Sequence, residues 1–201
     1  MHVDWIIAAL GNPGERYAKT RHNIGWMVCE HLCAKHKASI VAGKGDYYQA
    51  ALRLRGKSVL VIFPTTYMND SGRAVEKVSN LYEVKSENIL IVLDEYNFPL
   101  GKVHLKFGGS DGGHNGAQSV IEELGNDKFW RLRCGIAKNF GMGELVDYVL
   151  REFNADEIEA RNAMITRAAD AIELVMLSGV SRASSAINSD NELFPLPRES
   201  N

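Results

Sequence analysis

The sequence predicts a single α/β domain with a mixed β-sheet flanked by helices on both faces. Three observations predict this class. Strand-like and helix-like runs alternate along the chain, which is typical of a sheet with crossover helices. The run 89–93 is continuously apolar, as in a strand that is covered on both faces. The segments 48–54 and 58–63 flank a short turn, which indicates a hairpin and therefore some antiparallel pairing.

The first half of the chain is expected to contain three strands and two helices. A strand at 5–10 leads into a polar loop at 10–25, where Asn12-Pro13-Gly14 forces the chain to turn. An amphipathic helix follows at 24–37. The hairpin strands 48–54 and 58–63 are joined by a turn at 55–57, and Pro64 ends the second of them. A second polar loop at 65–72 precedes a helix at 72–82.

The second half is expected to begin with the strand 89–93 and a third polar loop at 94–101. A short strand at 102–107, a glycine-rich loop at 108–116, a helix at 117–124 and a strand at 129–136 follow. After a short apolar piece at 146–150, Asp156 is expected to cap a long helix that ends at Ser178, before Gly179. We expect one domain over 1–186 and a polar tail over 187–201, which contains Pro195 and Pro197.

Composition sets limits on the class of protein. A chain of 201 residues that is 45% hydrophobic and 24% charged is ordinary for one globular domain with a sizeable core. The net charge of -2 excludes a surface that is basic throughout, so any contact with nucleic acid needs a local patch. The sequence shows neither an apolar run of about 20 residues nor a signal-peptide pattern, which predicts a cytoplasmic protein without membrane attachment.

The three cysteines do not indicate a disulfide framework. Cys29, Cys33 and Cys134 are few and odd in number, which fits a reducing compartment. Cys29, Cys33 and His36 would share one helix face, but their spacing matches no recognised zinc motif. We therefore expect small buried thiols there, and no metal.

Polar side chains recur in the loops that follow strands. The residues with chemical potential are Asn12 and His22, then Asn69, then Asp94, then His114 and Asn115. A carboxylate that accepts from one nitrogen of an imidazole leaves the other nitrogen free to take a proton from water. Asparagine amides can hold a carbonyl or amide group without adding charge. Several polar residues in these loops also fit a structural role. Asn23, Asn69, Asp70 and Asn115 all stand where helix caps are expected.

Other catalytic patterns find less support. The sequence has no Gly-x-Ser-x-Gly motif, so a serine acyl-enzyme lacks its usual signature. The loop 108–116 lacks the Lys-Ser/Thr of a nucleotide-binding P-loop.

Taken together, these loops resemble those of the bacterial peptidyl-tRNA hydrolase family. The matching stretches are Gly11 to Gly25, Pro64 to Gly72, Asp94 to Gly101, Gly108 to Gly116 and Arg131 to Ile136. Order and spacing agree from Val3 to about Gly179. The resemblance implies a monomeric α/β protein that needs no metal or organic cofactor. It also implies an enzyme that hydrolyses the ester between a peptide and the 3′ end of tRNA, with peptidyl-tRNA as its partner.

The resemblance also assigns roles to residues. His22 would be the general base for water, Asp94 would support it, and Asn12 would be the third catalytic group. Lys106 and Arg133 would bind the 5′ phosphate of the tRNA. The side chains implied in substrate binding are Tyr17, Tyr67, Met68, Asn69, His114 and Asn115.

The sequence departs from the common family pattern at several positions. Ala9 and Asn97 replace a common glycine and a common acidic residue. Ala137, Lys138 and Asn139 replace a common Gly-Arg/His-Pro, and Met142 stands where some members have a basic residue. None of these changes removes a proposed catalytic group, but those at 137–142 leave the outline of a tRNA-binding patch open.

Two alternatives remain at this point. One is an RNA-binding adaptor on the same fold, which the retention of His22, Asp94 and the three cleft asparagines disfavours. The other is an esterase for small molecules, for which Lys106 and Arg133 would be incidental surface charges.

Overall fold

The computed structural model describes residues 2–189, and these build one seven-stranded mixed sheet with the order β2-β3-β4-β1-β5-β7-β6. Parallel pairs join β1 to β4 and β5, and β5 to β7, while β2–β3, β3–β4 and β6–β7 pair antiparallel. The expected mixed sheet is therefore confirmed. The strands are β1 (Trp5–Ala9), β2 (Val41–Ala42), β3 (Tyr47–Leu54), β4 (Lys57–Pro64), β5 (Ile89–Glu95), β6 (Val103–Phe107) and β7 (Trp130–Gly135).

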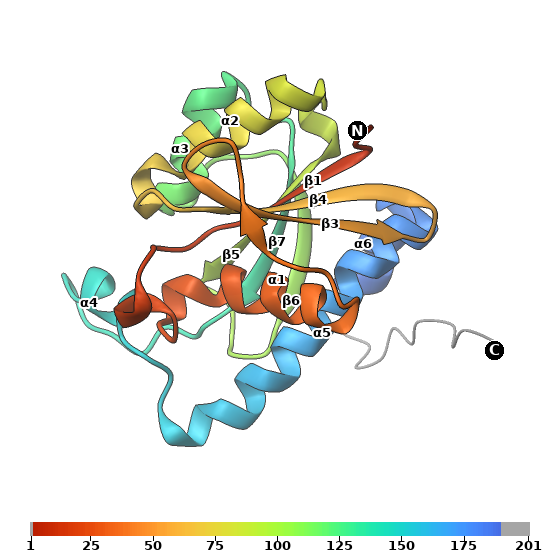
Figure 1. The fold of residues 1–201 in the computed structure, drawn as a ribbon. Helices are drawn as coiled ribbons and strands as arrows, with labels where there is room; N and C mark the ends of the chain where they lie inside the picture. The colour runs from red at the N-terminus through yellow and green to blue at the C-terminus, as the bar shows by residue number, and fades with distance from the viewer. Residues whose placement is uncertain (1, 190–201) are drawn as a thin grey trace.

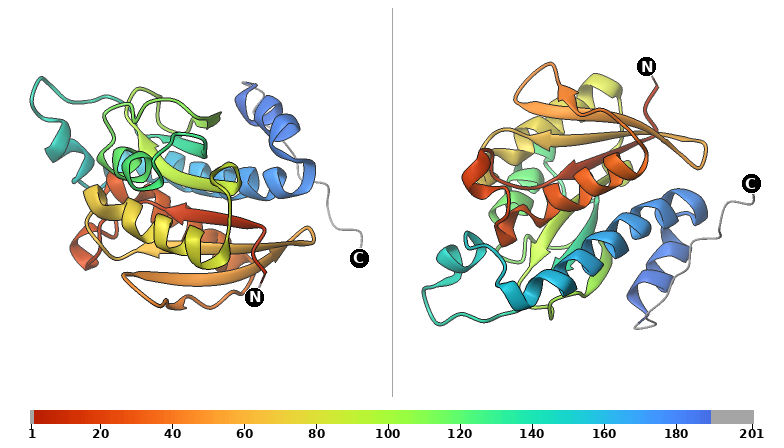
Figure 2. Two further views of the ribbon diagram at one scale, coloured as in Figure 1. Left: turned by 90° about the horizontal axis from the view of Figure 1, so that it is seen from above. Right: turned by 60° about the horizontal axis from the view of Figure 1, so that its bottom comes forward.

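Helices cover both faces of this sheet, as the sequence predicts (Figures 1 and 2). Helices α2 and α3 lie on one face, and α1, α5 and α6 lie on the other. The α-helices are α1 (Ile24–Lys35), α2 (Ser71–Tyr82), α3 (Asn115–Leu124), α4 (Leu145–Val149), α5 (Ile158–Ser178) and α6 (Val180–Asn188). Single turns of 3₁₀ helix are η1 (Glu15–Tyr17), η2 (Arg21–Asn23), η3 (Met68–Asp70), η4 (Ser86–Asn88) and η5 (Ala155–Glu157).

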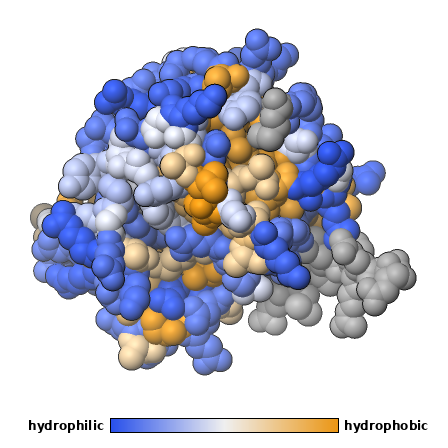
Figure 3. Space-filling view, viewed as in Figure 1, coloured by the Kyte–Doolittle hydropathy of each residue, from blue (hydrophilic) through white to orange (hydrophobic). Residues whose placement is uncertain are grey.

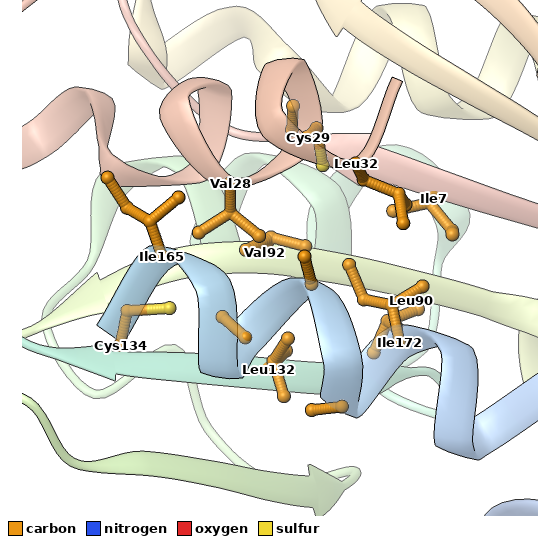
Figure 4. Packing of buried hydrophobic residues seen from close by; sticks show 14 of the residues in the cluster. Ile7, Val28, Cys29, Leu32, Leu90, Val92, Leu132, Cys134, Ile165 and Ile172 are labelled. Carbon is orange, nitrogen blue, oxygen red and sulfur yellow. The ribbon is translucent and has the colours of Figure 1, made fainter. Parts of the chain in front are cut away.

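The alternation of side chains along the central strands divides the core into two layers. Odd and even residues of β1 belong to different buried clusters, and every residue of β5 is buried. Figure 4 shows one layer, in which Val28 and Leu32 of α1 and Ile172 of α5 approach Leu90 and Val92 of β5. The continuously apolar run at 89–93 therefore is the doubly covered central strand that its composition indicates.

A close approach fixes where α1 begins. A Cβ added at Gly25 would lie 2.3 Å from the carbonyl oxygen of Val92 and 2.6 Å from that of Leu10. Only glycine fits at this point, so the first turn of α1 packs directly on the ends of β1 and β5. The preceding turn η2, with His22, is thereby held at the carboxyl edge of the sheet, where ligands bind in open α/β folds.

The C-terminal part differs from the sequence-based expectation. The cap at this point is Asn154, which forms a capping box with Glu157 at the start of η5, the turn that leads into the long helix, and not Asp156. Beyond Gly179 the chain forms α6, and Asn188 both accepts from the N–H and donates to the C=O of Leu105, at 2.8 Å each. Helix therefore extends to residue 188, past the expected boundary at 186. Most of the expected tail, including Pro195 and Pro197, lies outside the described residues.

The expected core thiols are confirmed. Cys29, Cys33 and Cys134 are buried and form no disulfide, and burial raises the pKa of the Cys33 thiol to about 11. His36 instead meets Glu173 of α5, with 2.9 Å between Nε2 and Oε1.

The outer surface is mainly hydrophilic on the face shown in Figure 3, where the apolar residues gather in a band near the centre of the view. Exposed apolar side chains include Val41 of β2 and Tyr48 of β3. None of the helices described for this chain has both the length and the apolar character needed to cross a bilayer.

Candidate active site

A pocket of about 360 Å³ opens at the carboxyl edge of the sheet and brings together segments that are far apart in the sequence. Its polar part combines the loop after β1, the end of β5 and the start of α3, and its apolar part comes from α4. The lining residues are Asn12, Tyr17, His22, Tyr67, Met68, Asn69, Asp94, Glu95, Tyr96, Gly112, Gly113, His114, Asn115, Leu145, Val146, Val149 and Leu150. Every residue expected in catalysis or in binding the ester end of the substrate lies in this one pocket.

Asp94 joins two histidines at the bottom of the site. Its Oδ1 lies 2.8 Å from Nδ1 of His22 and 2.9 Å from Nε2 of His114. The two rings lie 4.9 Å apart between centroids. All three side chains are buried. A carboxylate accepts both bonds, so each imidazole directs its N–H at Asp94.

The tautomers follow from these bonds. Nδ1 of His114 accepts from the backbone N–H groups of Gly116 and Ala117, at 3.1 and 3.2 Å. It therefore carries a lone pair, and the ring proton sits on Nε2, which donates to Asp94. His22 donates through Nδ1, which leaves Nε2 as its basic nitrogen. Of these two rings, His22 is therefore the one whose basic nitrogen accepts no hydrogen bond from the described residues.

The charges in this cluster shift the pKa values in opposite directions. Burial alone would raise the pKa of Asp94, but the two imidazoles outweigh it and hold the pKa well below its usual range. Burial also lowers the pKa of His22, but the charge of Asp94 outweighs this effect and leaves the pKa above its ordinary value. Asp94 is therefore ionised, and it makes His22 a stronger base.

His22, Asp94 and His114 also have the residue types of a metal site, with one potential ligand atom each within 4.8 Å of the others. A metal on Nε2 of His114 would require the ring proton on Nδ1, because a neutral imidazole carries only one proton. Nδ1 already accepts two backbone N–H groups. A proton there would face two donors, so the hydrogen bonds of His114 do not fit a metal ligand.

Asn12 is held rigidly beside the histidine. Its Oδ1 accepts from the backbone N–H of Met68 at 2.8 Å, and its main chain exchanges two hydrogen bonds with the Asn23 side chain, at 2.9 Å each. The amide nitrogen of Asn12 is therefore the group left to donate into the pocket. Asn23 does not cap α1 with its side chain, because that side chain fixes the Asn12 loop instead.

The remaining expected substrate residues differ in exposure. Met68 is buried under the pocket, while Tyr67, Asn69 and Asn115 are exposed at its rim and Tyr17 is half-buried. Neither Asn69 nor Asn115 caps a helix with its side chain, since that role at α3 belongs to His114. Their amides therefore remain available to a ligand.

Sequence reasoning missed the apolar wall of the pocket. Leu145, Val146, Val149 and Leu150 of the α4 region line it, and Val146 is 64% exposed. The signal was present as the short apolar piece at 146–150. A hydrophobic run too short for a core helix can instead mark a wall that a ligand covers.

Arg133 and Lys106 lie on the β6–β7 edge next to the pocket. The Arg133 guanidinium donates to Glu95, with 3.0 Å from Nε to Oε2, and stacks 4.5 Å from the ring centre of Phe98. Glu95 itself lines the pocket. Lys106 is exposed and lies opposite Arg131 in the β6–β7 ladder. Of the two expected phosphate ligands, Arg133 thus adjoins the pocket through Glu95, with which it already shares its charge.

Comparisons with known proteins give matches over nearly the whole chain. The family model described as peptidyl-tRNA hydrolase matches residues 6–193. The chain is 39% identical over 184 residues to the peptidyl-tRNA hydrolase of Chlorobaculum parvum, covering 91% of this chain and 97% of the relative. It is 40% identical over 185 residues to that of Thermodesulfovibrio yellowstonii, covering 91% and 98%.

A solved structure is similar over the same extent. The crystal structure of peptidyl-tRNA hydrolase from Acinetobacter baumannii superposes with a TM-score of 0.87 at 32% identity, covering 94% of this chain and 97% of that one. Family model, curated relatives and solved structure agree over nearly the whole length. The chain therefore belongs to the peptidyl-tRNA hydrolase family.

Proposed function

We propose that the protein hydrolyses the ester between a peptide and the 3′ end of tRNA, with His22 as general base, and so returns tRNA from stalled or prematurely released translation products. As a member of its family, the protein is a hydrolase that acts on ester bonds. The observation that carries the mechanism is the tautomer of His22. Its Nδ1–H is bonded to Asp94, which leaves Nε2 as the one basic ring nitrogen in the pocket.

In this mechanism a water molecule attacks the ester carbonyl while Nε2 of His22 takes its proton. The resulting tetrahedral intermediate carries a negative oxygen, to which the Asn12 amide donates. The intermediate then collapses, the bond to the ribose oxygen breaks, and the imidazolium returns the proton to that oxygen. Base catalysis of this kind contributes about 10²- to 10⁴-fold, and one well-placed oxyanion donor contributes roughly 3 kcal/mol. No metal or organic cofactor takes part in these steps.

The rest of the pocket binds the two parts of the substrate. The exposed amides of Asn69 and Asn115 suit the peptide backbone or the terminal ribose. Tyr17, Tyr67 and Met68 supply contact surface, and His114 keeps Asp94 in place. Lys106 and Arg133 bind the 5′ phosphate, a contact that reads no base sequence and admits many tRNAs. We further propose that the protein acts as a cytoplasmic monomer.

The direct test is the His22→Ala variant. We expect turnover of an N-acylated aminoacyl-tRNA to fall by about 10²- to 10⁴-fold, while the KM stays within a few-fold, because the amides and the phosphate site remain. Circular dichroism would show whether the variant is folded. Near-normal turnover in a folded variant would reject His22 as the base.

The same substrate separates the alternatives. A non-catalytic adaptor would bind the acylated tRNA without releasing its peptide. An esterase for small molecules would cleave a simple alkyl ester as well as the tRNA ester. We expect rapid release from the tRNA ester alone.

A further inference from the structure

Three nitrogen-bearing side chains pack around the ring of Phe98, close to the pocket. Arg133 stacks over it at 4.5 Å and the Lys102 ammonium lies 5.2 Å from its centre. The His104 ring lies 5.5 Å away, between centroids. Arg133 belongs to β7, His104 belongs to β6, and Lys102 is the residue before β6. These contacts place three basic side chains around one aromatic ring.

The register of the sheet explains why they share one face. His104 is the direct partner of Arg133, and Lys106 is the direct partner of Arg131. Directly opposed residues, and residues two apart on one strand, point to the same side of a sheet. His104 therefore stands between the two residues proposed to bind phosphate, although the sequence motifs single out neither it nor Lys102.

His104 is a neutral ring in a positive environment. No described protein group bonds to its Nδ1, which is buried. Burial lowers the pKa of the imidazole. The cations of Arg133, Lys102 and Lys106 lower this pKa further. Among the described residues, Glu95 of β5 pairs with Arg133.

That pairing reduces the net positive charge at this corner. Glu95 takes the Nε and one terminal nitrogen of Arg133, so part of the guanidinium charge is already offset. A terminal phosphate monoester has a second pKa near 6 and carries up to two negative charges at neutral pH, whereas an internal phosphodiester carries one. A dianion over Phe98 would favour a proton on His104, which the three cations otherwise repel.

We propose that His104 is a third ligand of the phosphate site, which takes up a proton when the terminal phosphate monoester of an RNA substrate binds beside Arg133 and Lys106. The inference rests on the proposed function, because it deepens the phosphate site assigned there. The proton comes from solvent and stays on the imidazole while the phosphate is bound. Discrimination for a 5′ phosphate then grows as the pH falls.

The test compares one N-acylated aminoacyl-tRNA with its 5′-dephosphorylated form. The ratio of their kcat/KM values measures phosphate discrimination, and titration of His22 cancels in it. In the unaltered protein we expect the ratio to rise by about two- to fivefold between pH 8.5 and pH 6.5, because binding of the phosphate is linked to uptake of one proton by a group whose pKa rises by about one unit. Staying above pH 6.5 keeps protonation of the phosphate itself small.

Three variants sharpen the result. His104→Gln should give a pH-independent ratio equal to the unaltered protein's value at pH 8.5, and His104→Lys should give a high ratio at every pH. His31→Gln, in α1 on the opposite face of the sheet, should leave the pH dependence intact. A direct readout is the NMR titration of the His104 ring, whose pKa should rise on adding a 5′-phosphorylated RNA hairpin and not on adding its 5′-hydroxyl form.

The outcomes distinguish a failure of the phosphate site itself from a failure of the role proposed for His104. If the unaltered protein cleaves both tRNA forms equally at all pH values, the phosphate site of the proposed function is wrong, although the ester chemistry stands. If it discriminates with a pH-independent ratio, or if His104→Gln keeps the pH dependence, the inference about His104 is overturned.

Discussion

At the level of single residues, the Asp94 carboxylate determines how the candidate active site works. One oxygen, Oδ1, receives both ring protons, at 2.8 and 2.9 Å. His114 is held in turn by the N-terminus of α3, so the helix, Asp94 and His22 form one hydrogen-bonded chain that ends at the basic nitrogen. His114 is in this arrangement a positioning residue for Asp94 more than a contact for the substrate.

The Asp94→Asn variant tests this chain through its pH dependence. The proposed mechanism needs neutral His22, so we expect activity to rise with pH through the His22 pKa, which Asp94 holds above its ordinary value. The amide keeps an oxygen acceptor but loses the charge, so we expect the rising limb of the kcat profile to move to lower pH. The plateau should fall by about 10²-fold or more, because the imidazolium loses its counter-charge. An unshifted limb would contradict the role of Asp94.

A second residue-scale prediction concerns Ala137. It has a φ of 64°, a left-handed conformation that costs a non-glycine residue about 1 kcal/mol, and it stands where the common pattern has glycine. Ala137→Gly should therefore raise the free energy of unfolding by up to about 1 kcal/mol. Ala18→Gly is the control, because Ala18 has an ordinary φ of -54° and glycine there should destabilise by about 0.5–1 kcal/mol. Urea unfolding measures both, and a less stable Ala137→Gly variant would contradict the strain.

At the level of elements, the turn η2 is anchored to the α4–α5 connection by the backbone N–H of Arg21, which donates to the carbonyl of Arg151 at 3.0 Å, and by the buried Arg21 side chain. The Arg21 guanidinium donates to the carbonyl of Glu152 and to Oε2 of Glu157, at 2.6 Å each, and stacks 4.4 Å from the ring centre of Tyr148. Arg21 adjoins His22, and the connection follows the apolar wall of the pocket. The two walls of the pocket are thereby joined.

We expect Arg21→Gln to lower the free energy of unfolding by about 3 kcal/mol, since it leaves the part-buried carbonyl of Glu152 and the Glu157 carboxylate without their partner. The kcat should fall as well, because η2 loses its side-chain anchor. Arg16→Gln is a matched control, as Arg16 also stacks on a tyrosine but is exposed; its effect should stay within about 0.5 kcal/mol. Equal stability of the two variants in urea would show that the anchor is unimportant.

A comparison of the expected and observed helices and strands shows what the sequence can predict. The strand at 89–93 and the helix at 72–82 were predictable because the pattern of apolar residues along the chain indicates which side chains are buried. In both elements, burial determines the secondary structure. Helix α6 was not, because its apolar face is narrow and its attachment depends on Asn188 meeting the edge of β6. The choice of Asn154 over Asp156 as cap likewise depends on Glu157 folding back to the Asn154 N–H.

For the site, motifs predicted which residues gather but not how they are bonded. Asn12 and Asp94 were placed in one cleft from their positions after strands. That the Asn12 oxygen is already taken by Met68, or that Arg133 is paired with Glu95, depends on contacts between distant segments. Such contacts leave no spacing pattern in a single sequence.

At the level of the whole molecule, the distribution of charge fits the proposed substrate, which carries an uncharged ester and a negatively charged terminal phosphate. The chain has a net charge of -2, so tRNA is not attracted by the protein as a whole. Four cations, Lys102, Lys106, Arg131 and Arg133, lie on or next to β6 and β7. If the proposed phosphate site is right, this arrangement favours a ligand that carries an ester and a terminal phosphate close together over a long stretch of nucleic acid.

This distribution predicts a weak salt dependence. Each neutralised phosphate contributes about 0.9 to the slope of log affinity against log salt concentration on a duplex, so two or three contacts give a slope of about -2 to -3. Lys106→Gln should reduce its magnitude by about 1. Lys57→Gln, at the start of β4 on an exposed turn, should not change it. Binding titrations of an inactive His22→Ala protein between 50 and 300 mM salt (roughly the range in which such slopes are measured) would check this, and an unaltered slope for Lys106→Gln would remove that residue from the phosphate site.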